Sequence, residues 1–261
     1  MPDEKTYWPI PADFNALHNV VIEYAVRIQA EAAVKQEKLA EEPISHAALL
    51  SLHRIGIVTH RSIRSLCEAG WTQVSPILIR TLLDVLASCY AIVSKKEDAE
   101  YMAFKFMCSY FIQAIRDPDT SDELREHTRE QLDKMREQLT GEDIKRVDNF
   151  VANFKPLSYW FCPEFLSPGR IFKDKIPLLF PMYRQFSGST HGSFIGSVLF
   201  CDLPDAPSIN SQENPARTRD AIVASSRLLL DISFARGRFD GIADLAEYKE
   251  IVKTHILHHK R

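Results

Sequence analysis

The chain has 261 residues, of which 45% are hydrophobic and 26% are charged, and its formal net charge is -3. This length can bury one large hydrophobic core, and the composition is that of an ordinary globular protein rather than a disordered one. The slightly negative charge argues against a protein that coats nucleic acid regardless of its sequence, because such proteins need a basic surface to displace counterions from phosphates.

The N-terminal residues MPDEKTYWPIPADF are acidic and interrupted by proline, whereas a secretory signal peptide needs a basic start and an apolar run. We find no run that approaches the roughly 18 apolar residues of a membrane span. The chain contains no CxxC pair, which is typical of reduced and packed thiols. Its five cysteines are Cys67, Cys89, Cys108, Cys162 and Cys201. We therefore predict a cytoplasmic protein without a membrane partner.

Helical periodicity begins after a proline-bounded arm. Residues 13–41 have the pattern of an amphipathic helix with a charged end. A second helix is predicted over 45–69, and Gly70 is a usual helix stop. Residues 73–94 form the most apolar helical run in the chain, and residues 97–117 predict a further helix rich in aromatic side chains.

The middle of the chain changes character twice. Residues 121–139 are almost wholly charged, and Gly141 separates them from an amphipathic segment over 142–154. We expect residues 121–154 to form a helical hairpin that extends from the core. Residues 155–181 interleave prolines with aromatic residues, which favours an irregular segment that packs down as a cover.

The last third contains a polar helical stretch, a polar loop over 201–216, an amphipathic helix over 216–237 and a final helix that ends near His258. No segment alternates apolar and polar residues as strands do. The sequence thus predicts an all-α fold, a bundle of about eight or nine helices in one domain over residues 1–261. Its parts are a bundle core over 13–117 and 177–258, the hairpin extension over 121–154 and the irregular cover over 155–181.

Four residues of the second helix are spaced seven apart, namely His46, His53, His60 and Cys67. Seven residues of α-helix rise by about 10.5 Å, so no two neighbours in the series can share one metal ion. We predict that these histidines border a buried stripe and that some are hydrogen-bonded to partners on a neighbouring helix.

Arg80 and Asp84 stand four residues apart inside the most apolar helix. Burying a lone charge is prohibitive, so each must be paired or must reach a water-filled pocket. Two interpretations stay open, an internal salt bridge and a role in a functional site.

The stretch YRQFSGSTHGS, residues 183–193, gathers the most reactive side chains. If it is helical, Arg184, Ser187 and His191 lie on one stripe, at i, i+3 and i+7. An arginine can hold phosphate in a bidentate manner, and a histidine can exchange protons at neutral pH. Such a pair could cleave RNA without a metal, or these residues could form only a structural network. The candidates for catalysis are Arg184, His191 and Ser187. The candidates for binding or structural support are Arg80, Asp84, Tyr183 and Ser193.

Several standard sites are excluded. The chain has no glycine-rich phosphate loop, no GxSxG motif and no HExxH motif. His255 and His259 have metal-compatible spacing, but their position near the C-terminus favours a basic tail. We predict no metal ion and no cofactor.

The segments RSLCEAGW, LIRTLLDVLASCYAI and YRQFSGSTHGS resemble a bacterial group of helical proteins catalogued as a domain of unknown function. In that group an RxLLE or RxLLD helix and an SxxxH[GS] segment recur. The matching residues here are Arg80, Leu82, Leu83 and Asp84, followed by Ser187, His191 and Gly192. The resemblance covers about residues 50–200 and implies no established activity.

More distantly, Arg184 to His191 resembles the arginine, spacer and histidine motif of HEPN nucleases, with six residues between the pair. Arg54 and His60 match the same motif with five between. The resemblance implies a metal-independent endoribonuclease, a homodimer of the toxin or defence type, whose ligand is RNA or another phosphate-bearing molecule. The alternative is a non-catalytic module that binds a protein partner or senses a small ligand.

Overall fold

The computed structural model describes residues 10–37, 43–153, 168–190 and 215–257. Within these ranges the chain forms ten α-helices and no strand. The predicted all-α bundle is therefore confirmed.

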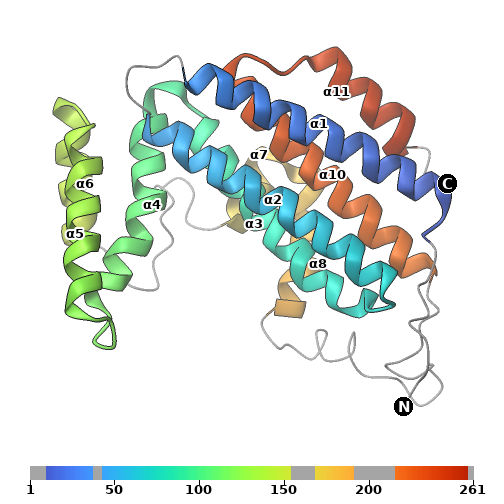
Figure 1. Ribbon diagram of the computed structural model, residues 1–261, viewed down its shortest axis with the longest axis horizontal. Helices are drawn as coiled ribbons and strands as arrows, with labels where there is room; N and C mark the ends of the chain where they lie inside the picture. The colour runs from blue at the N-terminus through green and yellow to red at the C-terminus, as the bar shows by residue number, and fades with distance from the viewer. Residues whose placement is uncertain (1–9, 38–42, 154–167, 191–214, 258–261) are drawn as a thin grey trace.

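Four long helices make the core of the bundle, and α10 packs against the other three (Figure 1). Each contributes leucines that are fully buried, among them Leu17, Leu49, Leu82 and Leu229. Burial of such side chains contributes about 1.5–3 kcal/mol each, so these interfaces dominate the stability. The four helices are α1 (Ala12–Gln36), α2 (Ile44–Glu68), α3 (Ser75–Val93) and α10 (Pro215–Asp240).

Gly70 ends α2 as predicted. Its φ of 78° lies in the left-handed region, which is accessible to glycine without a steric penalty. The backbone N–H of Trp71 then donates to the carbonyl of Leu66 at 2.8 Å, which satisfies one of the free carbonyls at the helix end.

Helix α3 corrects one expectation. It is long and apolar enough to cross a membrane by composition, although we found no such run in the sequence. Most of its surface is buried against the neighbouring helices, as in the core helix of a soluble protein.

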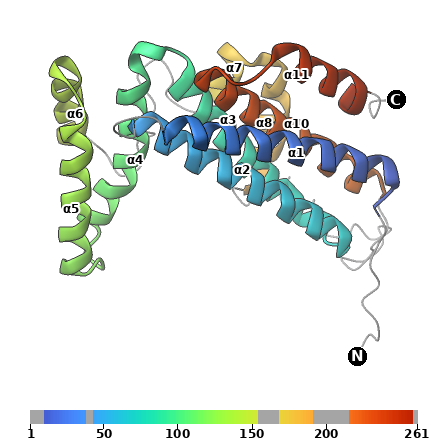
Figure 2. The ribbon, with the colours of Figure 1, turned by 45° about the horizontal axis from the view of Figure 1, so that its top comes forward.

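Helix α4 (Ala99–Arg116) leads out of the bundle to α5 (Asp122–Glu137) and α6 (Gly141–Asn153). Both of these helices pack against α4 and stand at one end of the molecule, away from α1 and α10 (Figures 1 and 2). Arg136 of α5 and Asp148 of α6 are joined by two 2.8 Å hydrogen bonds.

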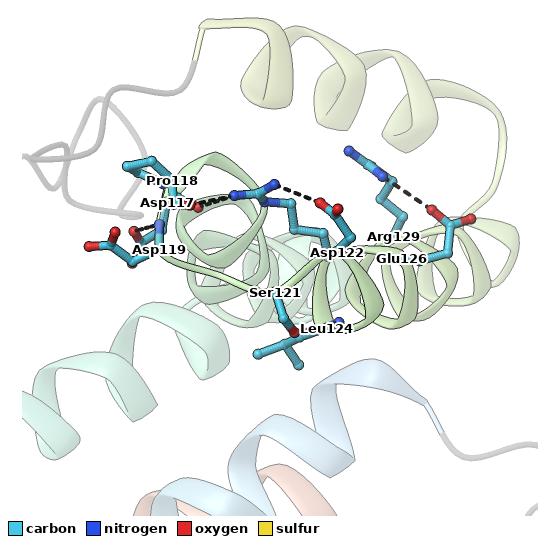
Figure 3. A network of polar contacts seen from close by, with 9 residues as sticks. Asp117, Pro118, Asp119, Ser121, Asp122, Leu124, Glu126 and Arg129 are labelled. Carbon is cyan, nitrogen blue, oxygen red and sulfur yellow. Dashed lines mark hydrogen bonds and ion pairs between the residues drawn. The ribbon is translucent and has the colours of Figure 1, made fainter.

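The turn into α5 is held by local polar contacts (Figure 3). The Ser121 hydroxyl accepts from the backbone N–H of Leu124 at 3.3 Å, which caps the helix. Arg125 donates to the carbonyls of Asp117 and Pro118, both at 2.9 Å. These bonds explain why so charged a segment starts a helix at this point.

The predicted irregular cover is wrong for its second half. Residues Pro168–Lys175 form α7, followed by a 3-10 turn over Pro177–Leu179 and by α8 (Phe180–Thr190). Helices α7 and α8 pack against α3. The prolines at 168 and 177 begin helical segments, where a missing N–H costs nothing, rather than interrupting them.

The last described helix is α11 (Leu245–Ile251), which continues as a π-helical turn to Ile256. The predicted polar loop over 201–216 falls almost entirely outside the described residues.

Candidate functional site

Arg80 is the centre of a polar cluster between α3 and α8. Its side chain is only 8% exposed, and each of its three nitrogens has its own partner. Nε donates to the Ser187 hydroxyl at 3.3 Å, and Nη2 donates to the Tyr183 hydroxyl at 3.0 Å. Nη1 pairs with the Asp84 carboxylate one turn further along α3. Because a buried guanidinium needs acceptors for its donors, these three contacts make the burial of Arg80 tolerable.

Tyr183 contacts Arg80 with its ring as well as its hydroxyl. The guanidinium carbon lies 4.2 Å from the ring centroid, within cation–π distance. On α7, Phe172 is fully buried, and its ring centroid lies 5.1 Å from that of Tyr183. One tyrosine thus joins α3, α7 and α8.

Asp84 differs from Arg80 in its access to solvent. Its side chain is 45% exposed, so the ion pair lies at the edge of the bundle rather than inside it. The salt bridge of the first interpretation is therefore present. The second interpretation, a role in a functional site, stays a prediction, and the Asp84 end of the pair reaches water.

The structure describes only part of the stripe that we predicted for Arg184, Ser187 and His191. Arg184 is exposed, whereas Ser187 is half-buried and turned toward Arg80. Within the described residues Arg184 pairs with no carboxylate. His191 and Ser193 lie outside the described residues, beyond the last residue of α8.

Comparison with known protein families identifies the segment that contains this cluster. The model of a family of unknown function, DUF5677, matches residues 46–206, more than half of the 261-residue chain. The chain belongs to this family. No curated protein and no solved structure matches it.

The DUF5677 match runs from α2 to beyond α8 and includes all seven residues that we predicted for the site. Helices α1 and α10 lie outside the matched segment. Helix α10 nevertheless packs on α2 and α3, and it therefore covers part of the family segment.

A second polar cluster in this DUF5677 protein escaped the sequence analysis. Arg227 and Asp231 stand four apart on α10, and Nε of Arg227 lies 3.0 Å from both carboxylate oxygens. The Tyr248 hydroxyl of α11 donates to Asp231 at 2.6 Å and accepts from Arg227 at 2.8 Å. The segments RTLLD on α3 and RLLLD on α10 share the spacing, which was the available signal.

The Arg80 cluster and the Arg227 cluster differ in the burial of their carboxylates. Desolvation raises the pKa of Asp231, although the Arg227 charge opposes the shift, and desolvation also raises the pKa of Tyr248. In the second cluster the carboxylate is buried and 10% exposed, whereas in the first Asp84 is half-exposed. The second cluster therefore fixes α11 on α10, and only the first presents a carboxylate to solvent.

The prediction for the histidines of α2 is confirmed. His53 and His60 are fully buried, and their partners lie on α10 and α1. His53 Nε2 lies 2.9 Å from the Ser233 hydroxyl, and His60 Nδ1 lies 2.9 Å from the Ser225 hydroxyl. At the start of α2, His46 Nδ1 lies 3.3 Å from the Asp240 carboxylate.

No group of three or more histidine, cysteine or acidic side chains in the described ranges is arranged to hold a metal ion. His255 lies in the described turn after α11, and His259 lies outside it. The cluster around Arg80 can hold α8 in place against α3. The exposed Arg184 can attract an anion at the surface.

Proposed function

We propose that this DUF5677 protein is a metal-independent, HEPN-like endoribonuclease whose catalytic pair is Arg184 and His191. Arg184 would neutralise charge on the phosphate as it develops in the transition state. His191 would accept the ribose 2'-hydroxyl proton while water protonates the leaving 5'-oxygen, or it would protonate the 5'-oxygen while water accepts the 2'-hydroxyl proton. The 2'-oxygen then forms a bond to phosphorus as the bond from phosphorus to the 5'-oxygen breaks, leaving a 2',3'-cyclic phosphate and a 5'-hydroxyl.

The exposure of Arg184 beside a fixed neighbour supports this proposal most directly. Tyr183, the residue before it, is bound to the buried Arg80 through its hydroxyl and its ring. Because α8 is anchored at Tyr183, the backbone position of Arg184 is fixed, and only its side chain has to be ordered when an anion binds. Arg184 pairs with no carboxylate of the described chain, so within those residues no ion pair has to break before an anion binds.

A second observation removes the competing pair. Arg54 is exposed, but His60 is 1% exposed, with His18 on one ring nitrogen and Ser225 on the other. A histidine whose two nitrogens are both bonded in the core cannot exchange a proton with RNA. The burial of His60 therefore argues against the match at Arg54 and His60, and we assign the proposed catalysis to Arg184 and His191.

RNA cleavage in EDTA tests the proposal. We expect the purified protein to cut a fluorescent single-stranded RNA between pH 6 and 8, and Arg184→Ala or His191→Ala to abolish cleavage. Arg54→Ala is the matched control, because it removes an exposed helical arginine that we do not place in the site. Intact RNA after incubation with protein whose thermal unfolding is cooperative would contradict the proposal.

The alternative is a non-catalytic module that binds a protein partner or a small ligand. The observation that favours it is the internal use of all three Arg80 nitrogens, which is what a structural cluster requires. In this case His191→Ala should lower the melting temperature and leave no activity to lose. Unchanged stability with lost cleavage would exclude this alternative.

The setting of the proposed activity is also a proposal. We place the protein in the cytoplasm as a homodimer that acts on RNA. Light scattering of the purified chain would measure the mass of the particle, and a monomer at micromolar concentration would contradict the dimer.

A further inference from the structure

Arg80 of α3 and Phe172 of α7 both contact the Tyr183 ring, and Gly169 of α7 lies close to the same ring. A Cβ atom added at Gly169 would lie 2.9 Å from Cε1 of the Tyr183 ring, 3.5 Å from Cζ and 3.6 Å from Cδ1. The first of these distances is shorter than any that folded proteins tolerate, because two carbon atoms are in optimal contact only at about 3.5–4.0 Å. Even one methyl group therefore forces the ring or the helix to move.

The ring has little room to yield. Its hydroxyl accepts a 3.0 Å hydrogen bond from Arg80, and the ring lies within cation–π distance of the same guanidinium. Phe172, one turn after Gly169 on α7, is fully buried against it. A displacement of the ring must therefore disturb either the Arg80 bonds or the packing of α7.

The backbone conformation of Gly169 does not explain the glycine. The positive φ angles of the described glycines occur at Gly70, Gly141 and Gly241, and Gly169 is not among them. The requirement for glycine at this position comes from the close approach alone.

We propose that Gly169 is a positioning residue for the site on α8, which consists of Arg184 and of Tyr183 bound to Arg80. By letting α7 lie directly against the Tyr183 ring, it sets the ring on Arg80 and so fixes the placement of Arg184, the next residue along α8. The packing part of this inference stands on the geometry, and its consequence for catalysis rests on the proposed function. A misplacement of about 1 Å at a catalytic group can lower a rate by about 100-fold, which gives the scale of the effect.

A double-mutant cycle tests the packing without any assay of activity. We expect Gly169→Ala to raise the unfolding equilibrium constant about tenfold in the wild-type background. In a Tyr183→Ala background the same change should be neutral or stabilising, because the ring is gone and alanine is the better helix former. An equal effect in both backgrounds would overturn the inference, since the cost would then not pass through Tyr183.

A spectroscopic measurement follows the site itself. The Nε–H of Arg80 is hydrogen-bonded to Ser187, so its guanidinium resonance should be resolved by NMR and assigned by its loss in Arg80→Lys. We expect Gly169→Ala to shift this resonance. Gly56→Ala is the matched control, because a Cβ there meets side-chain methyl groups at an ordinary 3.4 Å and lies on α2. An Arg80 resonance that does not move in Gly169→Ala would overturn the inference.

The catalytic consequence is measured by steady-state RNA cleavage well below the melting temperature. We expect Gly169→Ala to lower kcat about tenfold or more with little change in KM, whereas Gly56→Ala leaves both unchanged. An unaltered kcat in a variant with a shifted Arg80 resonance would refute the positioning role. If the wild-type chain does not cleave RNA, the proposed function fails, and the cycle and the NMR shift still decide the packing claim by themselves.

Discussion

His18 of α1 and His60 of α2 lie ring against ring in the core, with 2.9 Å between Nδ1 of His18 and Nε2 of His60. Their ring centroids are 4.8 Å apart. The other nitrogen of His60 meets the Ser225 hydroxyl, which donates its own proton to the carbonyl of Ile222 at 3.2 Å. Because the Ser225 hydroxyl has only one proton and gives it to Ile222, the hydroxyl must accept the bond from Nδ1–H of His60. Nε2 of His60 then carries no proton, so it accepts from Nδ1–H of His18. Both rings are neutral in this arrangement.

Acid should destabilise the protein through these histidines. Burial lowers the pKa of His18 to about 4, of His60 to about 3 and of His53 to about 4, all from 6.5. The unfolded chain thus takes up protons that the folded chain refuses, so stability is complete above pH 6.5 and falls as the pH drops toward 4. We expect a loss of at least about 2 kcal/mol between pH 6.5 and 4.5, measured by urea unfolding.

A variant separates this contribution from that of the acidic groups. Burial raises the pKa of Asp240, which acts with the opposite sign, since the folded chain then binds that proton more readily. The slope of stability with pH should become shallower in His53→Gln by about one proton, or about 1.4 kcal/mol per pH unit. His127→Gln, which removes an exposed histidine, is the control for the loss of an imidazole. Equal slopes in all three proteins would contradict the assignment.

Two neighbouring serines of α10 should respond differently to alanine. Ser225 and Ser226 are both fully buried, but only Ser225 bonds to a histidine, and the Ser226 hydroxyl has no partner in the described part of the chain. Ser225→Ala leaves an N–H of His60 unsatisfied and should cost about 1–3 kcal/mol in unfolding free energy. Ser226→Ala removes an unpaired buried hydroxyl and should be neutral or stabilising. Denaturant unfolding of the two variants measures the difference, and equal effects would argue against the histidine network.

Arg80 and Arg184 should differ in their effect on stability. Arg80→Ala leaves the hydroxyl groups of Tyr183 and Ser187 without their guanidinium, whereas the half-exposed Asp84 carboxylate can be solvated by water, so we expect a loss of about 1–3 kcal/mol. Arg184→Ala removes an exposed side chain and should change stability by less than about 0.5 kcal/mol. A large thermal shift in Arg184→Ala would show that this arginine supports the fold.

Gly237 of α10 should not tolerate alanine. A Cβ there would lie 2.6 Å from that of Ala243 and 3.0 Å from Cδ1 of Ile28. Overpacking of this kind costs about 1–3 kcal/mol and outweighs the roughly 1 kcal/mol that alanine adds as a helix former. Thermal unfolding of Gly237→Ala checks this, with Gly56→Ala as the variant that should be tolerated. A melting temperature at or above that of the wild type would contradict the close packing.

Three cysteines should be unreactive in the folded protein. Burial raises the pKa of Cys67, Cys89 and Cys108 to about 12, so almost no thiolate forms at pH 8. In a variant with Cys162 and Cys201 replaced by serine, we expect Ellman's reagent to label no thiol until denaturant is added. Rapid labelling in buffer would show that the core around α2, α3 and α4 opens.

The sequence by itself determined the all-α class and the long helices of the core, because helical periodicity and helix stops are local properties. Gly70 ends α2 where its pattern predicted, and the spacing of seven placed His53 and His60 on one line before any partner was known. Arg80 and Asp84 interrupt the apolar residues of α3, which is why a search for an uninterrupted apolar run passed over a helix whose mean hydropathy suffices for a membrane span. Local proline content also misled, since Pro168 begins a helix.

Only the tertiary structure decided which faces meet. Tyr183 and Ser187 reach Arg80 across more than 100 residues of sequence, as their separations of 103 and 107 show, and no periodicity encodes that pairing. The arginine and histidine motif occurs twice in the chain, and in one occurrence His60 is buried between His18 and Ser225, which spacing alone does not reveal. Sequence spacing defines the face of a helix, but the packing of another helix against that face determines whether a side chain on it meets a protein partner or water.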